Sequence, residues 1–70
     1  MTSEAHSLLN HLCSMPEGHG TLATKDLKGL LLETGGQVMA RGRLYDIASK
    51  LLGAGVYRVS LRARQGAQDE

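Results

Sequence analysis

The chain of 70 residues is poor in several residue types: it has one cysteine, one proline, two tyrosines, no phenylalanine and no tryptophan. The single cysteine, Cys13, cannot form an intrachain disulfide, and we find neither a charged-then-apolar leader nor a long apolar run. We therefore expect an intracellular protein without a membrane partner. Because aromatic side chains are so few, the core must consist chiefly of the twelve leucines. A chain of this length forms one small domain at most, and without a partner its stability is marginal.

The residue combinations of catalytic and metal sites are also missing. The candidate metal ligands lack the short paired spacings of zinc sites: they are His6, His11, Cys13 and His19. On a helix, residues five apart such as His6 and His11 do not share a face. Cys13 lies on or beside the apolar face of a predicted helix, so we interpret it as a small buried hydrophobe rather than a nucleophile. We therefore expect no enzyme, no metal and no cofactor.

Charge, in contrast, is present but unevenly distributed. The net charge is only +1, yet six of the eight lysines and arginines fall within residues 41–64, where Asp46 is the only acidic residue. Such a basic half favours a surface for phosphates or for an acidic partner. The alternative is an ordinary solvated face rich in arginine.

Helical periodicity is clear in the first half of the chain. Ser3 is a plausible N-cap for a helix whose apolar residues have helical spacing and which ends before Pro16. Thr24 can cap a second helix that Gly35 and Gly36 end. A short strand near residues 20–23 can precede this second helix. Residues 37–40 are ambiguous between a turn and a short extended piece.

The second half predicts a third helix followed by a strand. Apolar residues at i, i+3, i+4, i+7 and i+8 predict an amphipathic helix from about Arg41 to Gly53: they are Leu44, Ile47, Ala48, Leu51 and Leu52. From Tyr57 to Arg64 the period changes to two, which predicts a strand with one buried face and one basic, solvated face. Residues 65–70 form a polar tail that we expect to be disordered.

This order of elements is that of a winged helix-turn-helix. We predict a mostly α domain over residues 1–64, with three helices and a short, degenerate wing. Residues 21–23 can pair with part of the strand at 56–64, but only six polar residues remain after Arg64 to supply another wing strand. A strand left unpaired on one side invites another chain. We therefore expect a protein partner or a homodimer through this strand edge or through a leucine surface.

One segment also resembles a known family. Residues 43–56, RLYDIASKLLGAGV, resemble the recognition helix and following turn of the E-two-F and DP (dimerisation partner) cell-cycle transcription factors. Their motif has two adjacent arginines, any residue, and then Tyr-Asp. Here Arg43 matches the second arginine, Gly42 stands in place of the first, and Arg41 lies one residue earlier. The resemblance implies a nuclear DNA-binding protein whose recognition helix, at about 41–53, reads guanine edges in the major groove.

Together, charge and resemblance predict binding of double-stranded DNA by a transcription-regulator-like domain. The expected contacts come from the third helix and the strand: Arg41, Arg43, Tyr45, Lys50, Arg58, Arg62 and Arg64. Two of the motif residues have other interpretations, since the ring of Tyr45 can pack on the domain edge and Asp46 can pair with Arg43 or Lys50. The alternative function is a winged-helix protein–protein interaction module within a larger nuclear or nucleic-acid-processing complex. The substitution at Gly42 and the missing wing strand favour that alternative.

Overall fold

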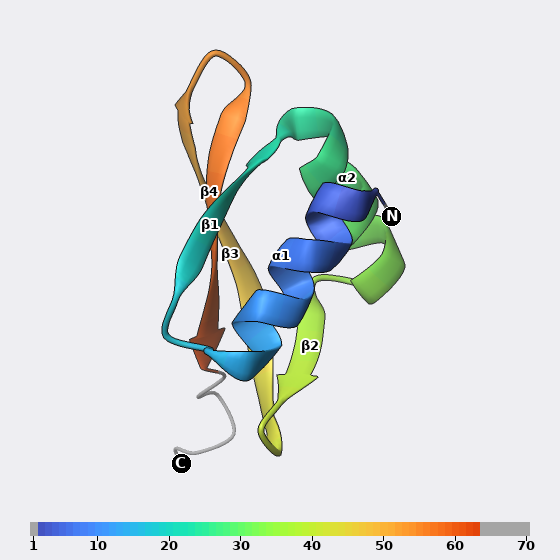
Figure 1. Cartoon of the computed structure of the whole chain (residues 1–70), viewed down its shortest axis with the longest axis vertical. Coiled ribbons are helices and arrows are strands. Elements are labelled where there is room, and N and C mark those ends of the chain that lie inside the picture. Colours follow the sequence, from blue (N-terminus) through green and yellow to red (C-terminus); the bar gives the residue numbers. More distant parts are fainter. Residues whose placement is uncertain (1, 64–70) are drawn as a thin grey trace.

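The computed structural model describes residues 2–63, which form two helices and four strands (Figure 1). In chain order the elements are α1 (Ser3–Ser14), β1 (His19–Ala23), α2 (Thr24–Thr34), β2 (Gln37–Ala40), β3 (Arg43–Gly53) and β4 (Val56–Ala63). Neither helix is long and apolar enough to cross a membrane. The described chain is therefore a mixed α and β structure.

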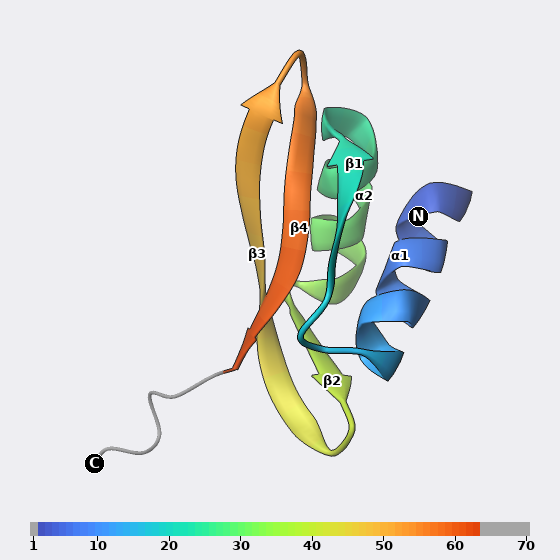
Figure 2. The ribbon, with the colours of Figure 1, turned by 60° about the vertical axis from the view of Figure 1, so that its left-hand side comes forward.

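The four strands form one antiparallel sheet in the order β1-β4-β3-β2. Both helices lie on the same side of this sheet, and no other element covers its opposite face within the described residues (Figure 2). The core lies between the helices and the sheet, and every buried apolar side chain in its central cluster is at most 6% exposed: Ala5, Leu12, Leu22, Leu27, Leu30 and Val59. An antiparallel sheet packed on one side leaves its other face to solvent.

Both predicted helices are confirmed, with small changes at their ends. The hydroxyl of Thr2, rather than Ser3, accepts a hydrogen bond from the Ala5 N–H at 3.3 Å and caps α1. Gly35 ends α2 in the left-handed conformation, with φ 70°, and its N–H donates to the carbonyl of Leu31 at 2.8 Å. Glycine is favoured there because a side chain would strain a positive φ.

The predicted pairing of residues 21–23 with the last strand is also confirmed, since Thr21, Leu22 and Ala23 pair with Arg58, Tyr57 and Val56. Thr24 does not cap α2; its N–H and its hydroxyl both donate to the carbonyl of Gly55, at 2.9 and 3.1 Å. These two bonds tie the β3–β4 turn to the junction of β1 and α2. The far end of the long hairpin is thereby held against the helical layer.

The predicted third helix is wrong. Residues 43–53 form strand β3, and the ambiguous segment at 37–40 forms its partner β2. The cause lies in two tight turns, because Arg41 and Gly42 have φ values of 53° and 78°, and Ala54 and Gly55 have φ values of 52° and 74°. Two consecutive positive φ values are the requirement of the type I′ turn, which joins antiparallel strands. The mostly α, three-helix winged-helix prediction is therefore overturned.

The prediction of a degenerate wing with a free edge on the last strand is wrong for the same reason. β4 lies between β1 and β3, so both of its edges are paired. The sequence has no candidate strand after Arg64 to pair with the last strand. β3, which precedes β4 in the chain, takes that position. The predicted tail at 65–70 lies outside the described residues, and so does Arg64.

The core assignment gives a first test. Leu30 is fully buried, whereas the side chain of Leu51, central to the predicted helix, is 57% exposed. We expect Leu30→Ala to lower the free energy of unfolding by about 2–5 kcal/mol and Leu51→Ala by less than about 1 kcal/mol. Denaturant titrations followed by circular dichroism measure both values, and an equal loss from the two substitutions would contradict this core.

The β2–β3 turn gives a second test, because the helix and hairpin interpretations predict opposite signs for one substitution. A Cβ at Gly42 would meet nothing within 4 Å, so only the positive φ of this residue opposes a side chain. We expect Gly42→Ala to destabilise the protein by roughly 1 kcal/mol. In a helix the same change would stabilise by about 0.5–1 kcal/mol. A raised melting temperature would therefore favour the helix.

Candidate functional site

The uncovered face of β3 and β4 carries most of the basic side chains of the sheet. Residues directly opposite on antiparallel strands share a face, and the register pairs Lys50 with Arg58 and Asp46 with Arg62. The buried Val59, which lies between these positions on β4, points to the opposite side, into the core. Lys50, Arg58 and Arg62 therefore project away from the helices. We call this surface of β3 and β4 the basic face.

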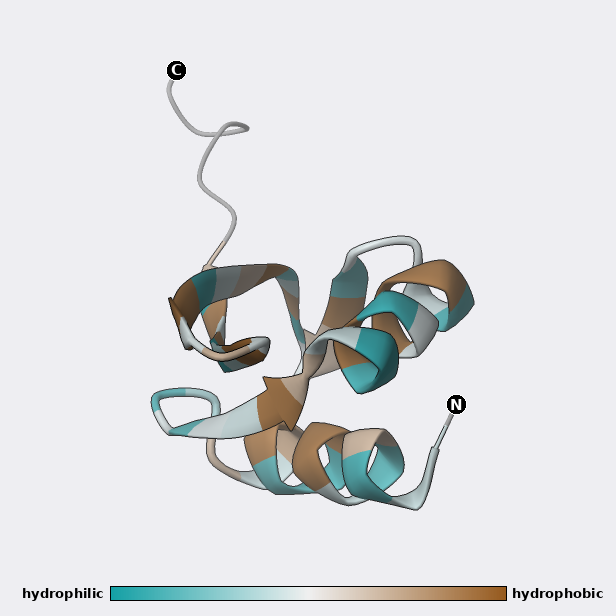
Figure 3. Ribbon diagram, turned by 90° about the horizontal axis from the view of Figure 1, so that it is seen from above, coloured by the Kyte–Doolittle hydropathy of each residue, from teal (hydrophilic) through white to brown (hydrophobic). Residues whose placement is uncertain are grey.

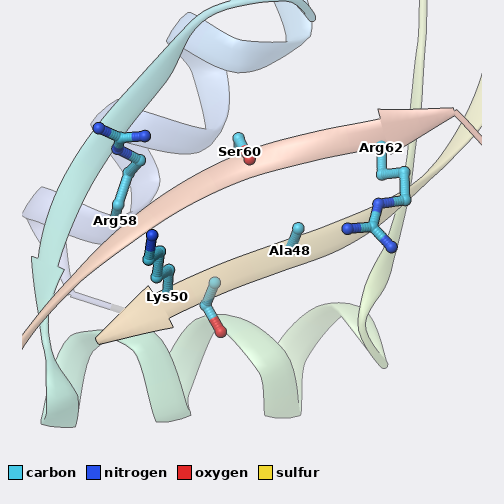
Figure 4. Close-up of a pocket in the computed structure, with 6 residues that line it drawn as sticks. Ala48, Lys50, Arg58, Ser60 and Arg62 are labelled. Atoms are coloured by element: carbon cyan, nitrogen blue, oxygen red, sulfur yellow. The ribbon is translucent and has the colours of Figure 1, made fainter. Parts of the chain in front are cut away.

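The basic face is hollowed at its centre. A shallow hollow of about 200 Å³ is lined by Ala48, Ser49, Lys50, Arg58, Ser60 and Arg62. Figure 4 shows Lys50 and Arg58 at one end of it, Arg62 at the other, and the short side chains of Ala48 and Ser60 between them. Ala48 and Ser60 are cross-strand partners. Two short side chains opposite one another leave room that long basic side chains on either side can enclose.

Positive charge dominates one end of the hollow. Lys50 and Arg58 are exposed cross-strand neighbours. Two like charges directly opposite one another repel, so an anion bound between them would relieve that repulsion. At the other end Asp46 lies opposite Arg62 and accepts a hydrogen bond from Gln37 Nε2 at 3.4 Å. The positive potential of the face is thus greatest around Lys50 and Arg58.

The seven predicted DNA-contacting residues do not all lie on one surface. Lys50, Arg58 and Arg62 come together on the basic face, as the strand alternation predicts for the two arginines. Arg41 and Arg43 lie at the β2–β3 turn. Arg43 is two residues from Tyr45 on β3, so alternation places its side chain on the helix side of the sheet, and it is seven residues, or about 23 Å, from Lys50. The two turn arginines are therefore not part of the basic face.

The structure also changes the interpretation of Tyr45 and of the motif around it. Tyr45 is half-buried and pairs with Val38 and Ala63, on the helix side of the sheet. This side of the sheet is opposite to the basic face, which favours the packing interpretation of Tyr45 over a phosphate contact. Arg43 begins a strand, so this structure contains no recognition helix at 41–53 to place that arginine in a groove. Asp46 accepts a hydrogen bond from Gln37 Nε2, and its expected pairing with Arg43 or Lys50 stays a prediction.

Sequence reasoning missed the floor of the hollow. Ala48 and Ser60 have no distinctive chemistry, and they become neighbours only when the β3–β4 register is known. The usable signal was the pair of turns, since Arg41-Gly42 and Ala54-Gly55 are both two-residue connections that end in glycine. They would have defined β3 as a strand and placed Lys50 opposite Arg58.

The other chemistry-bearing residues do not assemble into a second site. Within residues 2–63, no three side chains among histidine, cysteine, aspartate and glutamate come together as metal ligands. Cys13 is half-buried, and its Sγ lies 3.9 Å from the carbonyl oxygen of Met39. Its partial burial suits a small apolar side chain better than an exposed nucleophile.

Comparisons with protein-family models, curated proteins and solved structures found no match. The resemblance of residues 43–56 to the E-two-F and DP proteins therefore stays a prediction. Any functional conclusion depends on the basic face itself.

Proposed function

We propose that the protein binds double-stranded DNA, and that it does so through phosphate contacts from the basic face of β3 and β4. The observation that supports this proposal is the position of Lys50, Arg58 and Arg62 around one hollow on an otherwise uncovered sheet face. Lysine and arginine contacts to phosphates provide most of the sequence-independent affinity of DNA-binding proteins. The proposal does not depend on a recognition helix.

The arrangement suits a row of anions better than one compact anion. Arg58, Ser60 and Arg62 follow one another at every second position of β4, so neighbours are about 6.6 Å apart and the whole row is about 13 Å long. Lys50 widens the row on β3. Phosphates repeat at comparable intervals along a nucleic acid strand, and both the hydroxyl of Ser60 and the guanidinium groups can donate to phosphate oxygens.

A duplex fits this face better than a single strand. Sheets that bind single strands stack bases on exposed aromatic rings. Both tyrosines of this chain, Tyr45 and Tyr57, are half-buried and pair with residues on the helix side of the sheet. The basic face therefore has no stacking platform among the described residues. Strands of other DNA-binding proteins lie in the major groove of a duplex, which is about 12 Å wide.

The salt dependence of DNA binding tests this proposal. Three phosphate contacts give a slope of about −2.7 in a plot of log K against log salt concentration. The double substitution Arg58→Ala and Arg62→Ala should reduce the slope to about −0.9 and weaken binding to all duplexes alike. Fluorescence anisotropy with a labelled duplex of mixed sequence, at several salt concentrations, measures both quantities.

The matched control removes the same charge elsewhere. Arg41→Ala with Arg43→Ala also deletes two arginines, but from the β2–β3 turn, and should leave the slope near the wild-type value. Equal effects of the two double substitutions would show that net charge rather than the basic face determines binding. A wild-type protein without affinity for any duplex at low ionic strength would refute the proposal. Tighter binding of a single strand of the same length would refute the choice of duplex.

A further inference from the structure

Strand β3 has a free edge over its second half. β2 pairs only with the first four residues of β3, Arg43–Asp46, whereas β3 continues to Gly53. Past this point β3 lies at the margin of the described molecule, with β4 on its other side (Figure 2). The chain that could have extended β2 backwards turns instead at Gly35 and Gly36 into the end of α2. A neighbouring strand is therefore missing beside residues 48–52.

The direction of the backbone groups along this edge follows from one hydrogen bond. The Ile47 N–H donates to the carbonyl of Gly36 at 2.9 Å, on the side away from β4. Because these groups alternate in direction along a strand, the N–H and C=O groups of Ser49 and Leu51 also point away from β4. β2 does not reach these groups, because it pairs only with Arg43–Asp46. The edge thus presents two unpaired donors and two unpaired acceptors in strand geometry.

The side chains beside these groups define what could pair there. Lys50 projects on the basic face next to Arg58, and Leu51 projects on the other side, where it is 57% exposed. In an added antiparallel strand, the residue opposite Lys50 would lie within contact of its ammonium group. An acidic residue at that position would neutralise Lys50, and apolar residues on the opposite side would cover Leu51.

A second copy of β3 suits this edge less well. Symmetric antiparallel pairing that uses the groups of both Ser49 and Leu51 places Lys50 directly opposite Lys50 of the second copy. Like charges in that position are destabilising. The bulge between Leu51 and Gly53 interrupts the regular strand, which limits registers shifted toward the hairpin end.

We propose that the β3 edge at Ser49–Leu51 binds an extended acidic segment of a partner protein by strand addition. Main-chain hydrogen bonds to Ser49 and Leu51 provide the affinity, and Lys50 selects an acidic residue flanked by apolar ones. This inference shares Lys50 with the DNA-binding proposal, but its main-chain contacts lie on the strand edge, and peptide binding tests it in the absence of DNA.

A pair of synthetic peptides tests the inference. The first is an end-blocked octapeptide of alternating valine and glutamate, and its matched control has lysine in place of glutamate. We expect the isotope-labelled protein to bind the glutamate peptide only. Hydrogen exchange at the amides of Ser49 and Leu51 should then slow, while exchange at Thr21 on β1 should not. Slowing at β1 instead, or equal binding of both peptides, would overturn the proposal.

Two variants identify the contributions of charge and backbone. Lys50→Glu should weaken binding of the glutamate peptide roughly tenfold, because an attractive cross-strand pair becomes a repulsive one. The same substitution should allow the lysine peptide to bind. Ser49→Pro removes a donor from the free edge without removing a bond to β4, and it should abolish binding of the glutamate peptide. If Ser49→Pro does not fold, the wild-type exchange pattern and Lys50→Glu decide the question. A peptide-free dimer in sedimentation that Lys50→Glu leaves intact would overturn the proposal.

Discussion

The pairing of β3 with β4 is the interaction on which the remainder of this structure depends. It extends from the Tyr45–Ala63 pair to the Gly53–Val56 pair, and it places β4 at the centre of the sheet. β4 then provides the buried Val59 to the core and the paired edge for β1. Figure 3, which views the molecule from above, shows the hairpin strands and the two helices around the segment that leads into α2. Without this pairing, the sheet would divide into two separate strand pairs, β1 with β4 and β2 with β3.

The β3–β4 pairing also places basic side chains and core side chains on opposite faces of the sheet. Alternation along β4 sends Val59 and Leu61 toward the helices and Arg58 and Arg62 away from them, and the register brings Lys50 of β3 opposite Arg58. A chain with a net charge of only +1 thus gathers three cations on one face. The DNA-binding proposal uses that face, and the strand-addition proposal uses the neighbouring edge of β3. Both depend on β3 being a long strand.

Sequence patterns predicted the elements that bury their apolar residues. α1, α2 and β4 each show a period that matches their burial, and all three are confirmed. β3 does not, because Leu44, Leu51 and Leu52 are 39%, 57% and 51% exposed and only Ile47 of its apolar stripe packs against the core. Leucines that are not buried carry no information about period, so their helical spacing was accidental. The local turn chemistry of Arg41-Gly42 and Ala54-Gly55 was the stronger signal.

The candidate site, too, could be predicted from the sequence only in part. The alternation on β4 was sufficient to predict Arg58 and Arg62 on one solvated face, and the structure confirms that placement. The position of Lys50 beside them required the β3–β4 register, which a pattern within one segment does not contain. The separation of Arg41 and Arg43 from the basic face likewise follows from the hairpin, since an extended strand is more than twice as long per residue as a helix.

The central claim is that residues 43–53 form a strand paired with β4, and nuclear Overhauser effects measure this directly. In this register the α-protons of Ile47 and Leu61 approach one another, and so do those of Ser49 and Val59, because these residues form pairs without mutual hydrogen bonds. We expect strong effects between both pairs of α-protons. Strong sequential amide–amide effects from residue 44 to residue 52, without either cross-strand effect, would show a helix there and contradict the account.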